Sequence, residues 1–249
     1  MEKIVEQKSG CALCGKELLY TFQTEEMQCV FCGKVLKSQA KCVDNHFVCD
    51  TCHSLPAMDL IEHSTIASAS KDPLDMAITL MKSPGVKMHG PEHHFLVPAV
   101  LLSAFYNASG QPEEKEARIK KARQRAEHVL GGFCGFYGNC GAAVGTGIFV
   151  SVMTDATPLS HGEWRQANLM TAQSLHAIAE SGGPRCCKRD SFLAILKAIQ
   201  FTKEQFQVQM VTVPATVRCE FHHLNKECKK TDCRFYPGER GNIEYRSNA

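Results

Sequence analysis

The sequence predicts a mainly α protein, in which a helical core domain is preceded by a small cysteine-rich head and followed by a short strand and a cysteine-rich tail. Three observations lead to this prediction. Paired cysteines crowd the first 52 residues. From residue 57 onward, apolar residues recur at helical spacing between helix start and stop signals. Three more cysteines then follow the last helical segment, at positions 219, 228 and 233.

The head contains two copies of one short motif, Cys-x-x-Cys-Gly-Lys, which begin at Cys11 and Cys29. A two-residue gap lets one tight turn bring two sulfurs about 3.5–4 Å apart, along one edge of a tetrahedron whose metal–sulfur bonds are about 2.3 Å. The glycine after each pair suits a turn with positive φ. We therefore expect residues 1–38 to form a zinc ribbon around one structural zinc ion. Its four thiolate ligands would be Cys11, Cys14, Cys29 and Cys32.

A second Cys/His metal-binding knuckle is predicted for residues 39–56. The candidate ligands between residues 42 and 53 outnumber the four that a tetrahedral ion needs. The most economical set for a second structural zinc ion is Cys42, His46, Cys49 and Cys52. The alternative is a redox-active Cys49/Cys52 pair, but such pairs usually open a helix after a strand. The sequence shows no such pattern here.

Disulfide bonds are the general alternative for these cysteines, and they require an oxidising compartment. The first ten residues are polar and charged, with no apolar stretch of signal-peptide length. We therefore expect a reduced, cytoplasmic protein. The uncharged segment 131–154 is rich in glycine and contains asparagine and cysteine, which makes it a poor membrane span.

The net charge of +2 does not require a nucleic acid partner. Zinc ribbons nevertheless often contact nucleic acid or another protein, so a partner of either kind stays open. We expect no membrane contact.

Residues 57–249 are predicted to form the helical core with its tail. Asp72-Pro73 is a helix start, and Ser83-Pro84-Gly85 ends that helix. Residues 112–130 form an amphipathic pattern with one apolar face. Further helices are expected over residues 92–106, 139–153, 160–182 and 187–200, and an alternating pattern predicts a strand over residues 207–213.

The tail cysteines have the spacing Cys219-x8-Cys228-x4-Cys233, which is similar to the first three positions of a Cys3His finger. No histidine follows Cys233. Three thiolates in a loop can instead hold three corners of a [4Fe–4S] cluster. The fourth iron would then be free for a substrate or held by a distant cysteine.

Two motifs of the core resemble a known family. They are Cys140-Gly-Ala-Ala-Val-Gly-Thr-Gly and Ser181-Gly-Gly-Pro-Arg-Cys186-Cys187-Lys188-Arg189. Over about residues 88–201 the chain is similar to iron–sulfur L-cysteine desulfidases and L-serine dehydratases. The resemblance implies a helical fold and a cluster that activates a leaving hydroxyl or thiol. Where the desulfidases have a Cys-Thr-Glu-Pro phrase, this chain has His89-Gly-Pro-Glu92-His93-His94 and lacks that cysteine ligand.

Taken whole, the sequence also resembles a cysteine-rich family of unknown function from strict anaerobes. The resemblance rests on the cysteine-rich head, the His-Gly-Pro-Glu-His phrase, the Cys-Gly-Ala helix, the Gly-Pro-x-Cys-Cys-Lys turn and the three-cysteine tail. This longer resemblance implies no particular chemistry.

The best candidates for a reactive site are Cys186 and Cys187. They begin a predicted helix, where backbone N–H groups, the helix dipole and neighbouring cations stabilise a thiolate. Glu92 or His93 would handle protons, and the resemblance implies that Lys188 holds a substrate carboxylate. The candidate cluster ligands are Cys140, Cys186, Cys219, Cys228 and Cys233.

These observations support one leading hypothesis and two alternatives. The leading hypothesis is an oxygen-sensitive iron–sulfur lyase, similar to a desulfidase, that acts on a small thiol or hydroxyl substrate. The first alternative is an all-zinc scaffold that binds protein or RNA, with the tail cysteines and His222 or His223 on zinc. The second is a sulfur-relay protein with a persulfide on Cys186 or Cys187.

Overall fold

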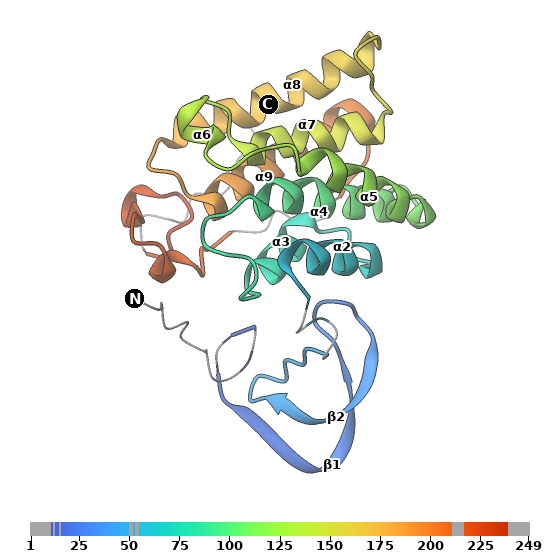
Figure 1. Cartoon of the computed structure of the whole chain (residues 1–249), viewed down its shortest axis with the longest axis vertical. Coiled ribbons are helices and arrows are strands. Elements are labelled where there is room, and N and C mark those ends of the chain that lie inside the picture. Colours follow the sequence, from blue (N-terminus) through green and yellow to red (C-terminus); the bar gives the residue numbers. More distant parts are fainter. Residues whose placement is uncertain are drawn as a thin grey trace.

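The computed structural model describes residues 11, 13–14, 16–49, 52, 55–210 and 217–238. A small β head lies at one end of a stack of helices (Figure 1). The mainly α fold predicted from the sequence is confirmed. Among the described residues, the helices are all too short or too polar to cross a membrane.

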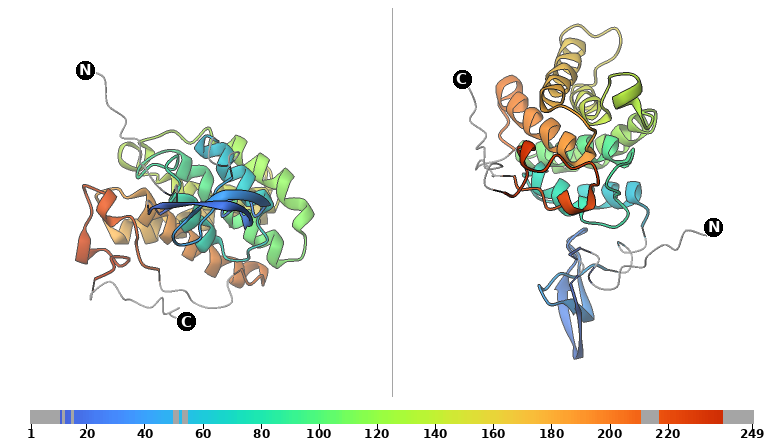
Figure 2. Two further views of the ribbon diagram at one scale, coloured as in Figure 1. Left: turned by 90° about the horizontal axis from the view of Figure 1, so that it is seen from below. Right: turned by 90° about the vertical axis from the view of Figure 1, so that its left-hand side faces the viewer.

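The head is an antiparallel hairpin of β1 (Leu18–Gln28) and β2 (Val35–Cys42). Leu18 pairs with Cys42 at one end and Gln28 with Val35 at the other. Between Tyr20 and Glu25 the register shifts, because β1 has extra residues there. The hairpin projects away from the helices (Figure 2). The predicted boundary between ribbon and knuckle, at residue 38, falls inside β2, so both segments belong to one hairpin.

Two short helices connect the head to the core: α2 (Ala57–Ala67) and α3 (Pro73–Met81). The predicted start of α3 is confirmed. Asp72 is its N-cap residue and accepts hydrogen bonds from the backbone N–H groups of Leu74 and Asp75. Phe31 of the head is 6% exposed and belongs to the same apolar core as α2 and α3.

The centre of the molecule is α4 (Glu92–Ala108), which is buried along almost its whole length. It packs against α2 and α3, and against three later helices: α5 (Lys115–Ala126), α7 (Gly141–Met153) and α9 (Cys187–Phe206). Pro98 lies inside this helix. The helix α7 approaches α4 closely, as its small residues predict: a Cβ on Gly145 would come within 2.9 Å of Pro98 Cδ.

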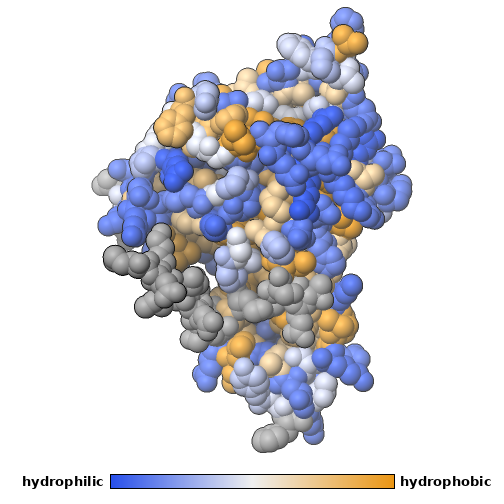
Figure 3. Space-filling view, viewed as in Figure 1, coloured by the Kyte–Doolittle hydropathy of each residue, from blue (hydrophilic) through white to orange (hydrophobic). Residues whose placement is uncertain are grey.

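The remaining helices complete the domain. They are η1 (Pro112–Glu114), α5, α6 (Phe133–Phe136), α8 (Gly162–Ser181) and α9. The helices η1, α5 and α9 contact α4, whereas α8 packs on α7 and α9. The predicted apolar face of α5 is buried at Ile119, Ala122 and Ala126. The short helix α6 was not predicted, and apolar residues reach the surface near it, whereas the surface over α5 is largely hydrophilic (Figure 3).

The predicted strand over residues 207–213 is wrong for its described part. Gln207 adopts the left-handed conformation and ends α9, and residues 208–210 form neither strand nor helix. Residues 211–213 lie outside the described residues. The alternation of apolar residues reflects partial burial of an irregular segment beside the core, because Met210 is 1% exposed.

The tail, described over residues 217–238, lies against α9 and the loop between α3 and α4 (Figure 2). It contains η2 (His222–Leu224) and η3 (Lys230–Asp232). Phe221 and Phe235 contact the ring of Phe192 in α9. The Lys229 ammonium donates a hydrogen bond to the carbonyl of Ser181 at 2.6 Å. These contacts bring the tail cysteines to the start of α9.

Candidate metal centres

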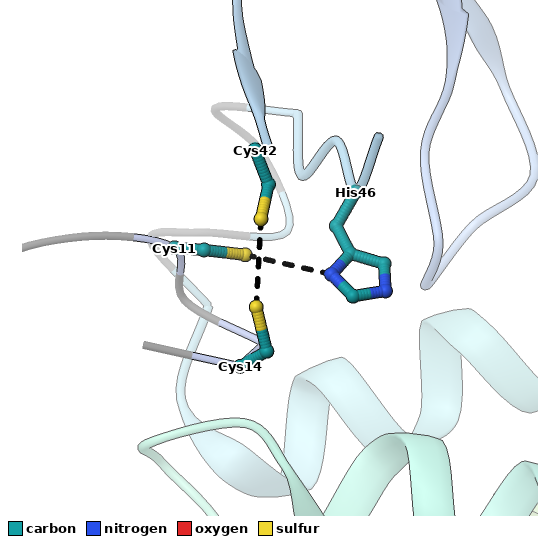
Figure 4. Close-up of side chains that lie close together, drawn as sticks. All are labelled: Cys11, Cys14, Cys42 and His46. Carbon is teal, nitrogen blue, oxygen red and sulfur yellow. Dashed lines mark hydrogen bonds between the residues drawn. The ribbon is translucent and has the colours of Figure 1, made fainter. Parts of the chain in front are cut away.

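The first candidate metal centre of the head lies where the N-terminal segment meets the end of β2 (Figure 4). Its ligand atoms all lie within 4.8 Å of one another, and they belong to Cys11, Cys14, Cys42 and His46. The sulfurs of Cys14 and Cys42 are 3.4 Å apart, and Cys11 Sγ is 3.9 Å from Nδ1 of His46. Three sulfurs and one imidazole nitrogen around a common point form a complete tetrahedral ligand set.

The second centre lies at the other end of the hairpin. It consists of four buried thiols within 4.8 Å of one another: Cys29, Cys32, Cys49 and Cys52. The sulfurs of Cys32 and Cys49 are 3.8 Å apart. Burial alone would raise the pKa of Cys29. Backbone N–H donors at Cys49, Cys32 and Phe31 outweigh it and lower this pKa to about 7. At Cys29 the backbone therefore favours the thiolate form that a metal ion requires, whereas burial raises the pKa of Cys32 and of Cys52.

The predicted grouping of these ligands is wrong, although all the predicted ligand residues lie in the two centres. The sequence placed Cys14 and Cys29 on one ion. In the structure, the 11 residues of β1 separate them, and antiparallel pairing brings Cys42 to the start of β1 instead. The chain then returns beside the hairpin turn, where Val30 donates a hydrogen bond to the carbonyl of Phe47. The two sites are therefore interleaved along the sequence.

A third group of cysteines lines one pocket between α9 and the tail. Its members are Cys186, Cys219, Cys228 and Cys233. The pocket encloses a cavity of about 20 Å³, with walls that include Met88, Phe192, Phe221 and Phe235. Among the described residues, only the two head centres bring three or more ligand atoms within 4.8 Å. The pocket thiols therefore face a common space but are more widely separated than the head ligands.

Cys186 is the N-cap residue of α9, and its sulfur accepts a hydrogen bond from the Arg189 N–H at 3.5 Å. Its pKa is nevertheless raised, because burial outweighs this bond. Burial also raises the pKa of Cys219 to about 11, and the neighbouring thiols of Cys186, Cys233 and Cys228 add to the effect. These thiols are thus close enough to influence one another.

Cys187 and Cys140, two other candidates from the sequence, are not among the residues that line the pocket. The sulfur of Cys187 accepts a hydrogen bond from the Gly90 backbone, and burial raises its pKa to about 11. Cys140 lies 3.9 Å from Asp190 Oδ2, and burial raises its pKa to about 12. The structure thus separates both residues from the tail cysteines.

The proposed proton-handling and substrate-binding residues are buried beside α9. The Lys188 ammonium donates to the carbonyls of Val86 at 3.1 Å and Met81 at 3.4 Å. Its side chain is fully buried, and burial lowers its pKa to about 8. Glu92 Oε1 accepts a hydrogen bond from the Lys87 N–H at 2.8 Å. Both side chains therefore hold the loop between α3 and α4.

His93 lies within the core and is 1% exposed. Its Nδ1 lies 3.0 Å from the Gly90 carbonyl and serves as the donor to it, while Nε2 has no hydrogen-bond partner among the described residues. Burial lowers the pKa of His93 to about 3. A neutral imidazole in this position fixes the turn that begins α4.

One buried polar residue that supports this region, Asp190, was not predicted from the sequence. Asp190 is buried and pairs with Arg189, with 3.0 Å between Oδ1 and Nε. His89 Nε2 lies 3.3 Å from Asn225 Oδ1 and so joins the loop before α4 to the tail. The sequence feature that could have identified Asp190 is the run Lys188-Arg189-Asp190 before an apolar helix. Consecutive charged residues at the start of a buried helix need partners, and oppositely charged neighbours can supply them.

One protein family matches the chain: a family of unknown function (DUF5714), over residues 61–236. No curated protein and no solved structure matches it. The matched span contains all four thiols of the pocket, whereas the ligands of both head centres lie before it.

Proposed function

For a chain that belongs to DUF5714, a family of unknown function, we propose a function from its own geometry: it is an iron–sulfur protein whose head is held by two zinc ions. The observation that carries the proposal is the contrast between its sites. In each head centre the four ligand atoms lie close enough to bind a single ion, whereas the pocket thiols line a cavity and are more widely separated.

The two head centres fit zinc. One offers three thiolates and an imidazole, the other four thiolates, and each set leaves no open position. These are the ligand sets of structural zinc sites. The hairpin has few other means of stability, because Tyr20 and Val35 are largely exposed. Zinc binding would therefore supply much of the free energy that folds the head.

The pocket between α9 and the tail fits an iron–sulfur cluster. Cysteine thiolates are the usual ligands of such clusters, and four thiols converge here from two elements. Wider separation suits a cluster, because its thiolates bind different iron atoms rather than one ion. Aromatic rings restrict water, and the N–H groups at the start of α9 offset negative charge.

The lyase form of the proposal, with a small thiol or hydroxyl substrate, receives less support from the geometry. It needs Lys188 and Glu92 to face a substrate, and both are occupied by backbone partners. The sulfur-relay alternative needs a thiolate nucleophile, and burial raises the pKa of both Cys186 and Cys187. We therefore propose cluster binding without assigning a catalysed reaction.

The test is anaerobic purification of the full chain, followed by iron, zinc and acid-labile sulfide analysis and an absorption spectrum. We expect about four irons and two zinc ions per chain, with an absorption band near ~400 nm. Three zinc ions and no iron would overturn the iron–sulfur proposal and favour the all-zinc scaffold.

A further inference from the structure

We propose that Cys186 is the fourth protein ligand of the pocket centre, so that Cys186, Cys219, Cys228 and Cys233 leave no iron open to a substrate. This inference rests on the proposed function and deepens it.

The position of Cys186 supports this assignment. It lines the same pocket as the three tail cysteines and is held there as the N-cap residue of a 20-residue helix. The Arg189 N–H already donates to its sulfur, as it would to a bound thiolate. Such a bond stabilises negative charge on a ligand sulfur.

The neighbouring candidates are directed elsewhere. Cys187 follows Cys186 directly, but its sulfur accepts a hydrogen bond from Gly90. Cys140 lies beside Asp190. His222 does line the pocket, but its Nδ1 lies 3.3 Å from the carbonyl of Cys219, and its ring packs against Tyr236. The sulfur of Cys186 is therefore the best-placed fourth ligand.

A complete set of four thiolates has a chemical consequence. A metal centre that activates a leaving group must keep one coordination position for the substrate. With Cys186 bound, this centre has none. It would instead link the tail to the start of α9, in addition to the contacts of the Phe192 ring with Phe221 and Phe235 and of the Lys188 ammonium with the Phe221 ring.

The experiment compares the anaerobically purified full-length protein with Cys186→Ser, and with Cys187→Ser and Cys140→Ser as matched controls. Iron, zinc and sulfide are measured per chain. We expect Cys186→Ser to lose most of the metal beyond the two head zinc ions, and both controls to keep the wild-type content. Loss of metal in either control with retention in Cys186→Ser would overturn the assignment.

Two readouts separate loss of the ligand from misfolding. The head zinc content and the helical circular dichroism signal should be unchanged in Cys186→Ser. In addition, limited proteolysis should cut the tail faster in Cys186→Ser than in Cys187→Ser. Equal cleavage rates would contradict the proposed link between the tail and α9.

A small thiol, 2-mercaptoethanol, tests whether an iron is open. Added to the wild-type protein, it should leave the absorption and electron paramagnetic resonance spectra unchanged. A spectral shift would show an open iron and overturn the four-ligand set. A wild-type protein with a third zinc ion that Cys186→Ser loses would instead confirm the ligand and overturn only the iron–sulfur proposal.

Discussion

The thiols of Cys186 and Cys187 lie at the positive end of α9, yet burial raises both of their pKa values. A helix N-terminus stabilises a thiolate through partial charges. Desolvation opposes this effect and dominates here. A site at this position therefore depends on a bound metal to hold the thiolates, rather than on intrinsically acidic cysteines.

At the same scale, Asp72 should contribute measurably to stability. Its carboxylate accepts the N–H groups of Leu74 and Asp75 at 2.9 and 3.1 Å. Replacement of an N-cap aspartate by alanine costs about 1 kcal/mol. We expect Asp72→Ala to lower the free energy of unfolding by about that amount in urea titrations, because two N–H groups lose their acceptor.

Asp72→Asn is the matched control, because an amide oxygen can accept the same bonds and asparagine caps helices about as well as aspartate. Its midpoint should stay near that of the wild type. If Asp72→Ala and Asp72→Asn unfold at the same urea concentration, the N-cap side chain contributes nothing to the free energy of unfolding.

Single residues were the most predictable part of the candidate site. Ligand spacing identified the three Cys-x-x-Cys pairs of the head, because such a turn places two sulfurs on one ion wherever it lies in the fold. Cys42 and His46 were identified because they complete a set of four ligands. The roles of Lys188 and Glu92 were less predictable. Their backbone partners, such as Val86 and Lys87, lie in a loop whose path only the tertiary structure fixes.

At the scale of elements, the β hairpin decides which cysteines share an ion. Antiparallel pairing brings Cys42 to the start of β1, beside Cys14, and leaves Cys29 at the turn. Spacing along the sequence suggested two consecutive sites. It does not show that an extended strand carries the two Cys-x-x-Cys pairs to opposite ends of the hairpin. The length of β1 between the Cys-x-x-Cys pairs was the available signal.

The interleaved arrangement makes a prediction about zinc content. Cys14→Ser/Cys42→Ser changes two ligands of one site, whereas Cys14→Ser/Cys29→Ser changes one ligand of each. We expect the first variant to lose one zinc ion and the second to lose two, in zinc analysis after dialysis against a weak chelator. Consecutive sites would give the reverse order, so the pair of variants decides between them.

The contact between α4 and α7 makes another prediction at this scale. A Cβ on Gly145 would lie 2.9 Å from Pro98 Cδ and 3.1 Å from the His94 carbonyl oxygen, both on the central helix. Such overpacking costs about 1–3 kcal/mol, against which alanine gains up to about 1 kcal/mol of helix propensity. We expect Gly145→Ala to lower the thermal unfolding midpoint.

Gly162→Ala is the control, because this glycine begins α8 and a Cβ there would meet no atom within 4 Å. Its midpoint should equal or exceed that of the wild type. If both variants unfold at the wild-type temperature, the close approach of α7 to α4 does not limit the packing.

At the scale of the whole molecule, the family match covers the helical domain and the pocket and leaves out the head centres. The head still contacts the core through Phe31. The mainly α fold could be predicted from the sequence, because apolar residues on the buried face of a helix recur with the helical period. The packing of the tail against α9 could not be predicted in this way, since contacts such as Phe192 with Phe235 join residues far apart in sequence.

Burial of the neutral side chain of His93 in this core makes the stability of the whole protein depend on pH. The pKa of His93 falls from 6.5 to about 3 on folding, first because of burial. Below pH 6.5 the unfolded chain therefore binds a proton that the folded protein does not. The free energy of unfolding falls as the pH drops from 6.5 towards 3, by at most about 1.4 kcal/mol per pH unit from this group.

Replacement of His93 by glutamine removes this titration. We expect urea unfolding followed at pH 7.5, 6.5 and 5.5 to show a smaller loss of stability below pH 6.5 in His93→Gln than in the wild type, even if the variant is less stable at pH 7.5. The comparison of slopes cancels the acid sensitivity of the head ligands, which both proteins share. Parallel slopes would mean that His93 is protonated in the folded core, and would contradict its neutral role at the start of α4.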